Sequence, residues 1–575
     1  MNALTFDAGF APSRIRLVDI RHHQLLTAQL RMLILAGGFA LIAFVALTRI
    51  AWLGVVQPAP TAHSMAQALL PPRGEITDRN GVPLARAFPA YALWYNPHAL
   101  GDGGPPLVNP PGVVAARLKA IFPDIDLAST ARLLAAGKPG YLRRRLLPDE
   151  VNAVNAIGEL ALETPGEKDR QYPQGSLAAH VLGYVGSDGH GRVGMESFLD
   201  SRLLDPAERG RPIPLSIDVR VQGALEDELA SGMRAVDAVG AAGIVLDVDS
   251  GEVLALASLP SFDPNRIDAN GQARMFNRVT NEVYELGSTF KPLTVAAAID
   301  NGVITDLGRR YPATPLHIDG FTIHDDENLG SSLNIPETLI HSSNIVSAQI
   351  ADQLGGDRLA RTLADLGMNE RPYIELPARG FPIWHKPPWP RLRTMTVGFG
   401  HGIAVTPLHL AAAYAALVNG GIWRPATLLK VQPGDEARGR RVFKASTSAR
   451  MNQLLRMVAV YGTGRKANAP GFRVGGKTGS AEKADAGGYN HHSVVATFAS
   501  AFPMDKPRYV VVVMLDDPKA NTASSFQRTA AWNAVPIVGR LIPRIGPMLG
   551  VLPDDSRDID LSDLKPLVGD GGGTE

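Results

Sequence analysis

The sequence of 575 residues contains no cysteine. The absence of thiols excludes a disulfide-stabilised scaffold, a zinc site with thiolate ligands and a cysteine nucleophile. It fits an oxidising compartment, where a free thiol is a liability. An excess of either charge is also missing, because 57 Lys and Arg stand against 56 Asp and Glu, for a formal net charge of +1. Nucleic-acid-binding proteins normally carry a strong basic excess, so this balance argues against that class.

The chain does have enough length and apolar content for several buried cores. Hydrophobic residues make up 45% of it, and the length predicts roughly three to five domains at ~150 residues each. The 58 glycines and 44 prolines predict many turns and loops.

A long apolar run lies near the N-terminus. Met32 to Thr48 is uncharged, Arg49 interrupts the run, and residues 50–56 are apolar again. Crossing a bilayer takes about 20 apolar residues, and an arginine near the end of the span can reach the interface. A cleaved signal peptide would have a shorter apolar core closer to the N-terminus, and a buried helix of a soluble protein would show a polar face. The apolar run begins too late and is too long for a signal peptide, so we predict an uncleaved anchor. Because basic residues precede the run, the N-terminus is expected to be cytoplasmic.

A charged motif follows the linker 57–70, at residues 72–81. Asn80-Gly81 predicts a type I′ hairpin turn between short apolar stretches. Arg73, Asp78 and Arg79 are either solvated surface charges or a buried charge network that holds a non-catalytic module together, and spacing alone leaves both open. Residues 85–212 show no metal-ligand spacing, and we interpret this region as scaffold.

The remainder predicts an α+β domain. Asp218 is a candidate N-cap for an amphipathic helix at 219–237. Apolar stretches on either side of the turn 249–251 predict a hairpin, and two more strand patterns appear late in the chain. The strands are expected at 243–248, 252–258, 494–502 and 508–516, with helices between them that include 335–354 and 406–419. Strands at both ends with helices between them predict an antiparallel sheet closed by distant segments.

Ser288 and Lys291 form the first candidate catalytic pair. Positions i and i+3 share a helix face, so the lysine amine can take the serine proton and leave the hydroxyl nucleophilic. The Ser-x-x-Lys pattern also occurs at Ser480–Lys483 and Ser562–Lys565. Only the pair at 288 combines a preceding glycine, a following apolar helix and a proline in the first turn. Taken alone, the motif still favours a helix-capping serine.

Two further polar motifs follow in the sequence. Ser342-Ser343-Asn344 is embedded in apolar sequence, and buried polar groups need partners; its hydroxyl and amide could bridge Lys291 and hold a substrate amide. The glycine-rich stretch 475–481 contains Lys477-Thr478-Gly479-Ser480, where a cation and hydroxyl donors could bind a carboxylate and the glycines permit close approach to an edge strand.

The order of these three motifs resembles that of penicillin-binding proteins and serine β-lactamases. The matching segments are Glu285–Pro292 (ELGSTFKP), His341–Asn344 (HSSN) and Lys477–Ala481 (KTGSA). A second resemblance is to the pedestal signature of class B penicillin-binding proteins, and the arrangement is most similar to the division-specific FtsI type. The residues of that pedestal signature are Arg73, Gly74, Asp78, Arg79, Asn80 and Gly81.

The resemblance implies a penicillin-binding transpeptidase fold, with an antiparallel sheet flanked by helices and an all-helical subdomain. This domain would stand on an extended α+β pedestal behind a single N-terminal transmembrane helix. The expected division is a cytoplasmic tail at 1–30, an anchor at 31–56, a pedestal at 57–212, a transpeptidase domain at 213–550 and a disordered acidic tail at 551–575. It leaves no room for a glycosyltransferase domain, and no C-terminal repeat modules are expected.

The resemblance also implies a D,D-transpeptidase of septal peptidoglycan. Ser288 would attack the D-Ala–D-Ala bond of a stem peptide with Lys291 as base and Ser342 as proton relay, and β-lactams would acylate the same serine. The residues expected to bind substrate are Asn344, Lys477, Thr478, Gly479 and Ser480, with the backbone N–H groups of Ser288 and Ser480 as the oxyanion hole.

No metal or cofactor is expected. The resemblance implies a location in the inner membrane with a periplasmic catalytic domain, and an FtsW-like glycan polymerase with other division proteins as partners. The motifs leave two alternatives open: the same chemistry in cell elongation, and a non-catalytic β-lactam sensor or division scaffold. The intact set of Ser288, Lys291 and Lys477 argues against the second.

Overall fold

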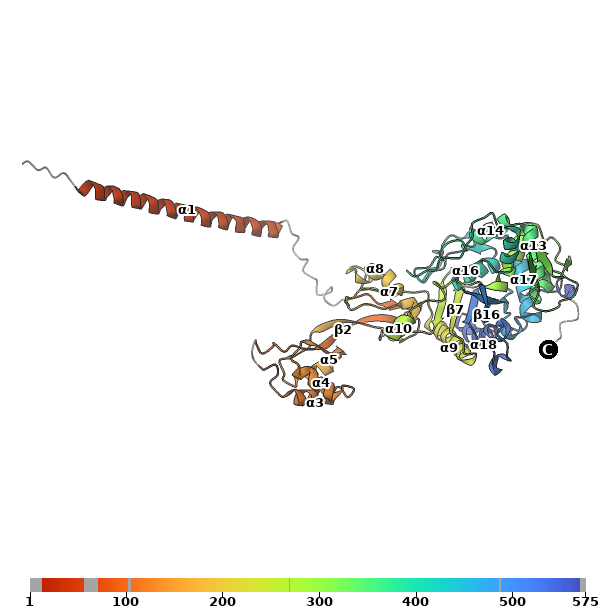
Figure 1. Cartoon of the computed structure of the whole chain (residues 1–575), viewed down its shortest axis with the longest axis horizontal. Helices are drawn as coiled ribbons and strands as arrows, with labels where there is room; N and C mark the ends of the chain where they lie inside the picture. Colours follow the sequence, from red (N-terminus) through yellow and green to blue (C-terminus); the bar gives the residue numbers. More distant parts are fainter. Residues whose placement is uncertain (1–12, 56–70, 102–104, 268, 486–487, 569–575) are drawn as a thin grey trace, which may run out of the picture. The chain divides into compact units, whose positions relative to one another are not determined.

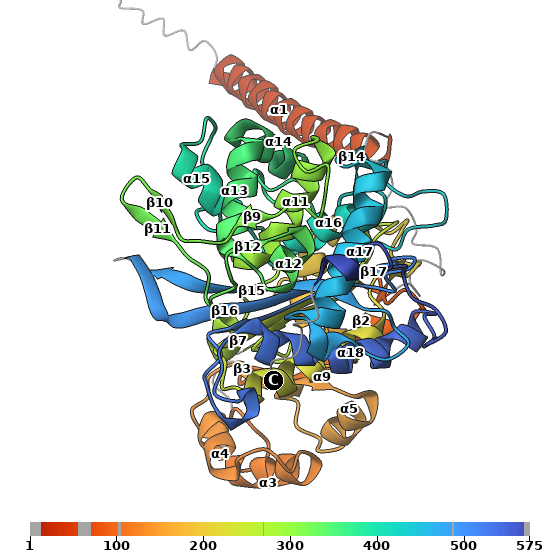
Figure 2. The same cartoon turned by 90° about the vertical axis from the view of Figure 1, so that its right-hand side faces the viewer.

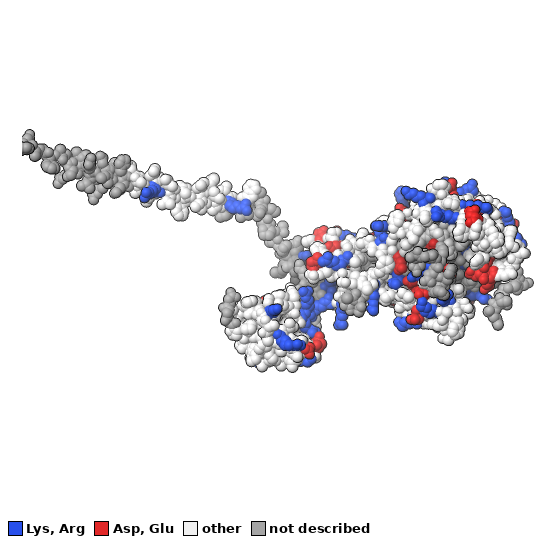
Figure 3. Space-filling view, in the orientation of Figure 1, with Lys and Arg blue, Asp and Glu red and all other residues white. Residues whose placement is uncertain are grey.

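The computed structural model describes residues 13–55, 71–101, 105–267, 269–485 and 488–568, and the chain divides into the units Met1–Leu70 and Pro71–Glu575. The described part of the first unit is one helix, α1 (Ser13–Val55) (Figure 1). Residues 26–49 of this helix are long and apolar enough to cross a membrane. Figure 3 shows Lys and Arg only towards the two ends of that stretch. These features are consistent with a single-pass anchor, although α1 begins well before residue 31.

The second unit begins with a sheet built around one long strand, β2 (Pro83–Tyr95). Its antiparallel partners are β1 (Ile76–Thr77), β3 (Gly140–Leu146), β4 (Leu162–Glu163) and β5 (Gly166–Gln171), and β6 (Ile213–Pro214) pairs with β1 in parallel. Helices α3 (Pro111–Ile121), α4 (Leu127–Ala135) and α5 (Pro148–Asn155) share a separate small core with this sheet. In that core the Tyr95 hydroxyl donates to the Leu134 carbonyl oxygen at 2.9 Å.

The turn between β1 and β2 differs from the predicted type I′ turn. A type I′ turn needs positive φ at both central residues, but only Gly81 has it, at 87°, among the residues of this turn. The Asp78 carboxylate organises the turn instead, because its Oδ1 accepts from the Asn80 and Val82 N–H groups at 2.8 Å each. Hydrogen bonds to the Asp78 side chain therefore stabilise this turn, in place of the type I′ backbone conformation expected from Asn-Gly.

Arg73 belongs to a buried charge network. Its Nε lies 2.8 Å from Glu196 Oε2, its Nη1 lies 2.7 Å from Asp200 Oδ1, and Arg170 Nε lies 2.6 Å from Glu196 Oε1. The Glu196 side chain is 0% exposed. The network joins β5 to two short helices, α7 (Gly194–Phe198) and α8 (Asp200–Leu204), which follow the short helix α6 (Ala179–Leu182). Of the two open interpretations of these charges, the buried network therefore describes Arg73.

A five-stranded antiparallel sheet of order β15-β16-β17-β7-β8 forms the centre of the second unit (Figure 2). Its strands are β7 (Gly240–Asp247), β8 (Val253–Leu259), β15 (Gly475–Asp485), β16 (Gly488–Phe502) and β17 (Tyr509–Asp516). The register pairs Tyr509 with Asp247 and Gly475 with Ala501. Strands from both ends of the region meet in one sheet, as the sequence predicted, and the expected α+β fold is confirmed.

Alternate residues of the central strands face two different cores. Val511 and Val513 pack with α9 (Val219–Ala235) and α18 (Ala534–Met548), whereas Val510 and Val512 face the other helices. Figure 2 shows α9 and α18 on one side of the sheet and the larger helical layer on the other. That layer comprises α11 (Lys291–Asp300), α12 (Ile335–Ile340), α13 (Asn344–Leu354), α14 (Gly356–Asp365), α15 (Arg391–Val397), α16 (Pro407–Val418) and α17 (Ala445–Tyr461).

Short elements complete the second unit. They are α10 (Ala269–Ala273), β9 (Tyr311–Pro312), β10 (Leu316–Ile318), β11 (Phe321–Ile323), β12 (Ser332–Leu333), β13 (Ile422–Trp423), β14 (Arg440–Arg441) and the 3₁₀ turns η1 (Gly287–Phe290), η2 (Arg465–Ala467), η3 (Thr522–Ser524), η4 (Ala530–Trp532) and η5 (Lys565–Leu567). The helix predicted over 335–354 is broken into α12 and α13 at residues 341–343.

Residues 551–568 of the C-terminal segment are ordered, which corrects the expectation of disorder there, and residues 569–575 lie outside the described part of the chain. Leu561 and Leu564 are buried in the main core. The Arg456 guanidinium on α17 binds both carboxylate oxygens of Asp558, at 2.6 to 2.9 Å. Burial and ion pairing offset the flexibility that the acidic, glycine-rich composition suggests.

Candidate active site

Ser288 lies in a turn that two neighbouring segments contact closely. The contacts are close because each segment has a glycine facing the turn. The turn η1 passes directly into α11, and Ser288 in it is half-buried. A Cβ at Gly400 would lie 2.0 Å from the Gly287 carbonyl oxygen, and a Cβ at Gly479 would lie 2.3 Å from the Leu286 carbonyl oxygen. Any larger residue at either position would push the backbone of the turn away. The buried Tyr414 hydroxyl also donates to the Thr289 carbonyl oxygen at 2.8 Å.

Lys291 is fully buried at the first position of α11. Its ammonium donates to the Ser342 carbonyl oxygen, to Ser342 Oγ at 3.1 Å and to Asn344 Oδ1 at 2.7 Å. Among the residues that the structure describes, it forms no ion pair. Burial lowers the pKa of Lys291 from 10.5 to about 7, against the opposing effect of the Asp325 and Asp326 carboxylates. The amine is therefore available as a base near neutral pH.

The turn between α12 and α13 presents two oxygens of Ser342 to Lys291. Ser342 has φ of 62°, in the left-handed region that side chains other than glycine seldom adopt. The next residue, Ser343, is the N-cap of α13, and its hydroxyl accepts from the Val346 N–H at 3.2 Å. The break in the predicted helix allows both Ser342 oxygens to accept from one amine, which a continuous helix could not do.

Asp325 holds this turn in place. Its Oδ2 accepts from the Ser343 hydroxyl at 2.7 Å, and its Oδ1 accepts from the N–H groups of Asn344 at 2.5 Å and Ile345 at 3.1 Å. A carboxylate at the start of α13 also interacts favourably with the helix dipole. Sequence reasoning missed Asp325, although its acidic run, residues 325–327, directly follows a strand-like stretch.

Lys477 approaches Ser342 from the sheet. It is fully buried on β15, and its ammonium donates to Ser342 Oγ at 2.9 Å and to Thr478 Oγ1 at 3.3 Å. Burial, and then the charge of Lys291, lower the pKa of Lys477. One hydroxyl between two amines can accept a hydrogen bond from a charged amine and donate a hydrogen bond to a neutral one. This geometry suits one charged and one neutral lysine, and the repulsion that lowers the pKa of Lys477 disappears when Lys291 is neutral.

Thr478 has a partner that sequence reasoning missed. Its hydroxyl lies 2.7 Å from the hydroxyl of Thr463, which follows α17. The glycines on either side of Thr463 in Gly462-Thr463-Gly464 were the available signal in the sequence. The two hydroxyls and the Lys477 ammonium together make a donor-rich pocket wall suited to a carboxylate.

Ser480 lies on an edge strand with its backbone towards the Ser288 turn. β15 pairs only with β16 among the described strands, so its other edge is open. A Cβ at Gly287 would lie 3.2 Å from the Ser480 carbonyl oxygen, and the N–H and carbonyl of one residue point to the same side of an antiparallel strand. The Ser480 N–H therefore also faces the turn. The Ser480 hydroxyl accepts from the Ala530 N–H at 3.0 Å.

The structure brings the three motifs together. Direct contacts join Lys291 to Ser342 and Asn344, and Ser342 to Lys477. The hydrogen bond between Lys291 and Ser288 that the sequence predicted is absent from the described residues. The other two Ser-x-x-Lys matches lie elsewhere: Lys483 pairs with Asp516 at 2.7 Å, and Ser562 is exposed in the C-terminal segment.

The pedestal signature residues lie apart from this site. Gly74 packs against the Arg209 backbone, Asn80 Nδ2 donates to Asp218 at 3.0 Å, and Arg79 lies 3.3 Å from Glu252. These contacts join the start of the pedestal to α9 and to the sheet. Within the described ranges, no group of three or more His, Cys, Asp or Glu side chains could hold a metal ion.

Comparison with protein families gives two matches. The penicillin-binding protein transpeptidase domain matches residues 241–536, and the penicillin-binding protein dimerisation domain matches residues 68–250.

Curated relatives match over most of their length. The probable peptidoglycan D,D-transpeptidase FtsI of Caulobacter vibrioides is 38% identical over 510 residues, which are 87% of this chain and 85% of that protein. The peptidoglycan D,D-transpeptidase FtsI of Escherichia coli K12 is 30% identical over 94% of this chain and 96% of its own.

Solved structures show the same fold. Penicillin-binding protein 3 from Mycobacterium tuberculosis, complexed with ampicillin, has a TM-score of 0.66 at 24% identity, covering 86% of this chain and 99% of that one. The transpeptidase domain of Burkholderia pseudomallei penicillin-binding protein 3 has a TM-score of 0.53 at 29% identity, covering 59% of this chain and 98% of that one.

Proposed function

The chain belongs to the class B penicillin-binding proteins of the FtsI type, and we propose that it crosslinks peptidoglycan stem peptides at the division septum through an acyl-enzyme on Ser288. It is a serine-type D,D-transpeptidase and a target of β-lactams, in line with the activity named for its curated relatives. One observation carries the assignment of residues: Lys291, three positions after Ser288, is a buried lysine with neutral partners and a pKa of about 7.

In the acylation step, neutral Lys291 takes the Ser288 proton while Ser288 Oγ attacks the carbonyl carbon of the D-Ala–D-Ala bond. Hydrogen bonds between catalytic groups often tighten only when substrate is bound, which accounts for the missing contact between Ser288 and Lys291. The N–H groups of Ser288 and Ser480 stabilise the oxyanion, and one such donor is typically worth about 10²–10³ in rate.

D-Alanine leaves when the peptide C–N bond breaks and its nitrogen receives the proton from Lys291 through Ser342. Lys477 and the Thr478 and Ser480 hydroxyls bind the terminal carboxylate, and Asn344 binds a substrate amide. Gly479 permits the close packing of β15 on the nucleophile turn.

In the second half of the reaction, an amine of another stem peptide attacks the Ser288 ester. The amine loses a proton to the same lysine, and Ser288 recovers its hydroxyl as the new amide forms. The charges and protons balance without a metal or an organic cofactor.

The helix α1 would anchor the protein in the inner membrane, with the N-terminus cytoplasmic and the catalytic domain periplasmic. We assign residues 57–212 to the pedestal and 213–550 to the transpeptidase domain. A FtsW-like glycan polymerase and other division proteins are the proposed partners, since a transpeptidase needs newly made glycan strands close by.

Labelling with a fluorescent penicillin tests the nucleophile. We expect the full-length protein to be labelled and Ser288→Ala to remain unlabelled. Ser562→Ala, the serine of the third Ser-x-x-Lys match, is the matched control and should label like the wild type. Equal labelling of Ser288→Ala and wild type would refute the assignment. For the division role, a fluorescent fusion should gather at the septum; a uniform sidewall pattern would favour elongation instead.

A further inference from the structure

A cavity of about 590 Å³ lies outside the catalytic cleft. Its walls come from residues 366–367 just after α14, the segment 370–379, the first turns of α16, the region of β13 and Arg438. None of its lining residues belongs to the Ser288 turn, to residues 342–344 or to β15. Its volume falls within the range of about 300–1,000 Å³ typical of ligand pockets.

Three arginines without partners surround the cavity. Among the described residues, the side chains of Arg371, Arg379 and Arg438 have no hydrogen bond or ion pair, and the Nε of Arg379 is buried with no acceptor. Glu370 is the one acidic residue in the lining. A buried guanidinium N–H without an acceptor is costly, which applies to Arg379, whereas Arg371 and Arg438 are exposed at the rim. The cavity therefore has a surplus of donors that an anionic ligand would satisfy.

An aromatic and apolar surface accompanies these charges. Trp423 lines the cavity, and its Nε1 is buried with no acceptor among the described residues. Its ring packs against Gly367, where a Cβ would lie 3.2 Å from Cζ2. Tyr373 is 57% exposed, and Leu408 and Ala412 of α16 add aliphatic surface. A lone inorganic anion would leave this surface uncovered.

We propose that this cavity is a second binding site for a peptide that carries at least two carboxylates separated by aliphatic groups. Arginine forms paired hydrogen bonds with carboxylates, and the three arginines belong to two separate segments, so they can take carboxylates at different points along one ligand. The apolar wall then covers the carbon chain between them. The choice of a peptidoglycan stem peptide as this acidic peptide rests on the proposed function, whereas the preference for an anion does not.

Helix α16 contacts both the cavity and the turn that contains Ser288. The first turns of α16 line the cavity, and Tyr414, further along the same helix, donates to the Thr289 carbonyl oxygen. A peptide bound here would lie on the transpeptidase domain without entering the cleft. The site could therefore hold an uncut strand while another peptide reacts at Ser288.

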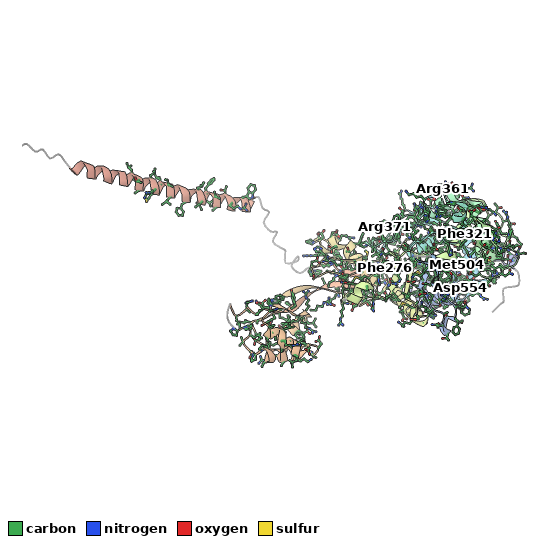
Figure 4. The ribbon with its side chains drawn as sticks, viewed as in Figure 1. Phe276, Phe321, Arg361, Arg371, Met504 and Asp554 are labelled. Atoms are coloured by element: carbon green, nitrogen blue, oxygen red, sulfur yellow. The ribbon has the colours of Figure 1, made fainter. Side chains whose placement is uncertain are left out.

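Calorimetric titration tests this site on the full-length protein in detergent, after penicillin has acylated Ser288. The probe is the synthetic tripeptide L-Ala-γ-D-Glu-meso-diaminopimelate, which has several carboxylates and no D-Ala–D-Ala bond. We expect saturable binding of one peptide per chain, weakened about tenfold or more by Arg371→Gln and by Arg438→Gln. The control is Arg361→Gln, an exposed arginine of α14 that Figure 4 shows apart from Arg371, and it should bind like wild type.

The outcomes separate this inference from the proposed function. The amide form of the tripeptide, without its carboxylates, should not bind, and inorganic phosphate should bind far more weakly than the peptide. No binding of the peptide, equal binding by both arginine variants and wild type, or equally tight binding of phosphate would overturn the inference. Penicillin labelling of each variant at the wild-type level shows that the variant is folded. A wild-type protein that penicillin does not label would count against the proposed function and not against this cavity.

Discussion

The pedestal and the active site both bury basic side chains, but the partners of these side chains differ in charge. In the pedestal, the guanidinium groups of Arg73 and Arg170 share the buried carboxylate of Glu196. In the active site, Lys291 and Lys477 are just as buried, yet their contacts are with the neutral oxygens of Ser342, Asn344 and Thr478. Both sets of charges lie in one chain and come from segments far apart in sequence.

This difference separates a structural role from a chemical one. A paired buried charge stays charged and fixes the positions of the elements around it. A buried lysine without a carboxylate partner loses its proton more easily, because desolvation disfavours the charged form. In the proposed mechanism, the absence of an ion pair at Lys291 lets this lysine act as a base, whereas Arg73 has two ion pairs.

The largest expected effect is a loss of acylation rate when Lys291 in the active site is replaced. Lys291→Met should slow penicillin acylation about 10²–10⁴-fold, the usual contribution of a general base. The variant should remain folded with an unchanged or higher Tm, since methionine fills the same space without burying an amine. Rates of penicillin labelling and a thermal melt measure both quantities.

The control for this substitution is Lys565→Met, the exposed lysine of the third Ser-x-x-Lys match. It should acylate at the normal rate. Normal acylation by Lys291→Met would show that the buried lysine is not the base.

Glu196→Gln in the pedestal should lower the free energy of unfolding and leave the acylation rate unchanged. Removing this charge leaves the buried Arg170 guanidinium without a counter-ion and Arg73 with Asp200 alone. Breaking a buried ion pair in this way typically costs about 3–5 kcal/mol of unfolding free energy. Denaturant titration measures the loss, and the folded fraction should still react with penicillin at the wild-type rate.

Glu208→Gln provides the comparison for Glu196→Gln. Glu208 pairs with Arg202 on the surface, where both side chains are about half exposed, and such pairs contribute only about 0–1 kcal/mol. Equal destabilisation by the two substitutions would contradict the structural role given to the buried network.

A smaller effect should distinguish two adjacent carboxylates. Asp325 binds the turn of residues 343–345, whereas Asp326 affects Lys291 and Lys477 through its charge. Asp325→Asn should slow acylation about 10–100-fold, because an amide cannot accept all of the hydrogen bonds that the carboxylate does. Asp326→Asn should change the rate only a few-fold.

Both aspartate substitutions should shift the pH dependence in the same direction. Each carboxylate raises the pKa of Lys291 against the effect of burial, so its removal should move the acid limb of the acylation rate to lower pH. Stopped-flow rates across pH measure this shift. Equal loss of rate in the two variants would mean that Asp325 acts only by charge.

The sequence was sufficient for the elements that local pattern controls. Apolar stretches beside turns predicted the strands at both ends of the sheet. Asp218 caps α9 as expected, since its side chain accepts from the Arg220 N–H at 3.0 Å. The order of the three motifs also predicted which polar side chains would meet at one site, and contacts among Lys291, Ser342 and Lys477 are present.

Features that depend on distant contacts were not predictable in this way. The break at Ser342 interrupts a good helical pattern, and it is stabilised by Asp325 and Lys291 from other segments. The C-terminal segment has the composition of a disordered tail, but Arg456, about 100 residues earlier in the chain, pairs with Asp558. The glycine of Asn80-Gly81 was correctly placed in a turn, while the Asp78 carboxylate decided the turn type.

The pH dependence of Ser288 acylation tests the central claim most directly. A base must be deprotonated to act, so lowering the pKa of Lys291 to about 7 predicts that the second-order rate of penicillin acylation rises with pH and levels off above an inflection near pH 7. The inflection should disappear in Lys291→Met. A rate that is independent of pH between about 5.5 and 9, or an inflection that remains near the ordinary lysine pKa of about 10.4, would contradict the account.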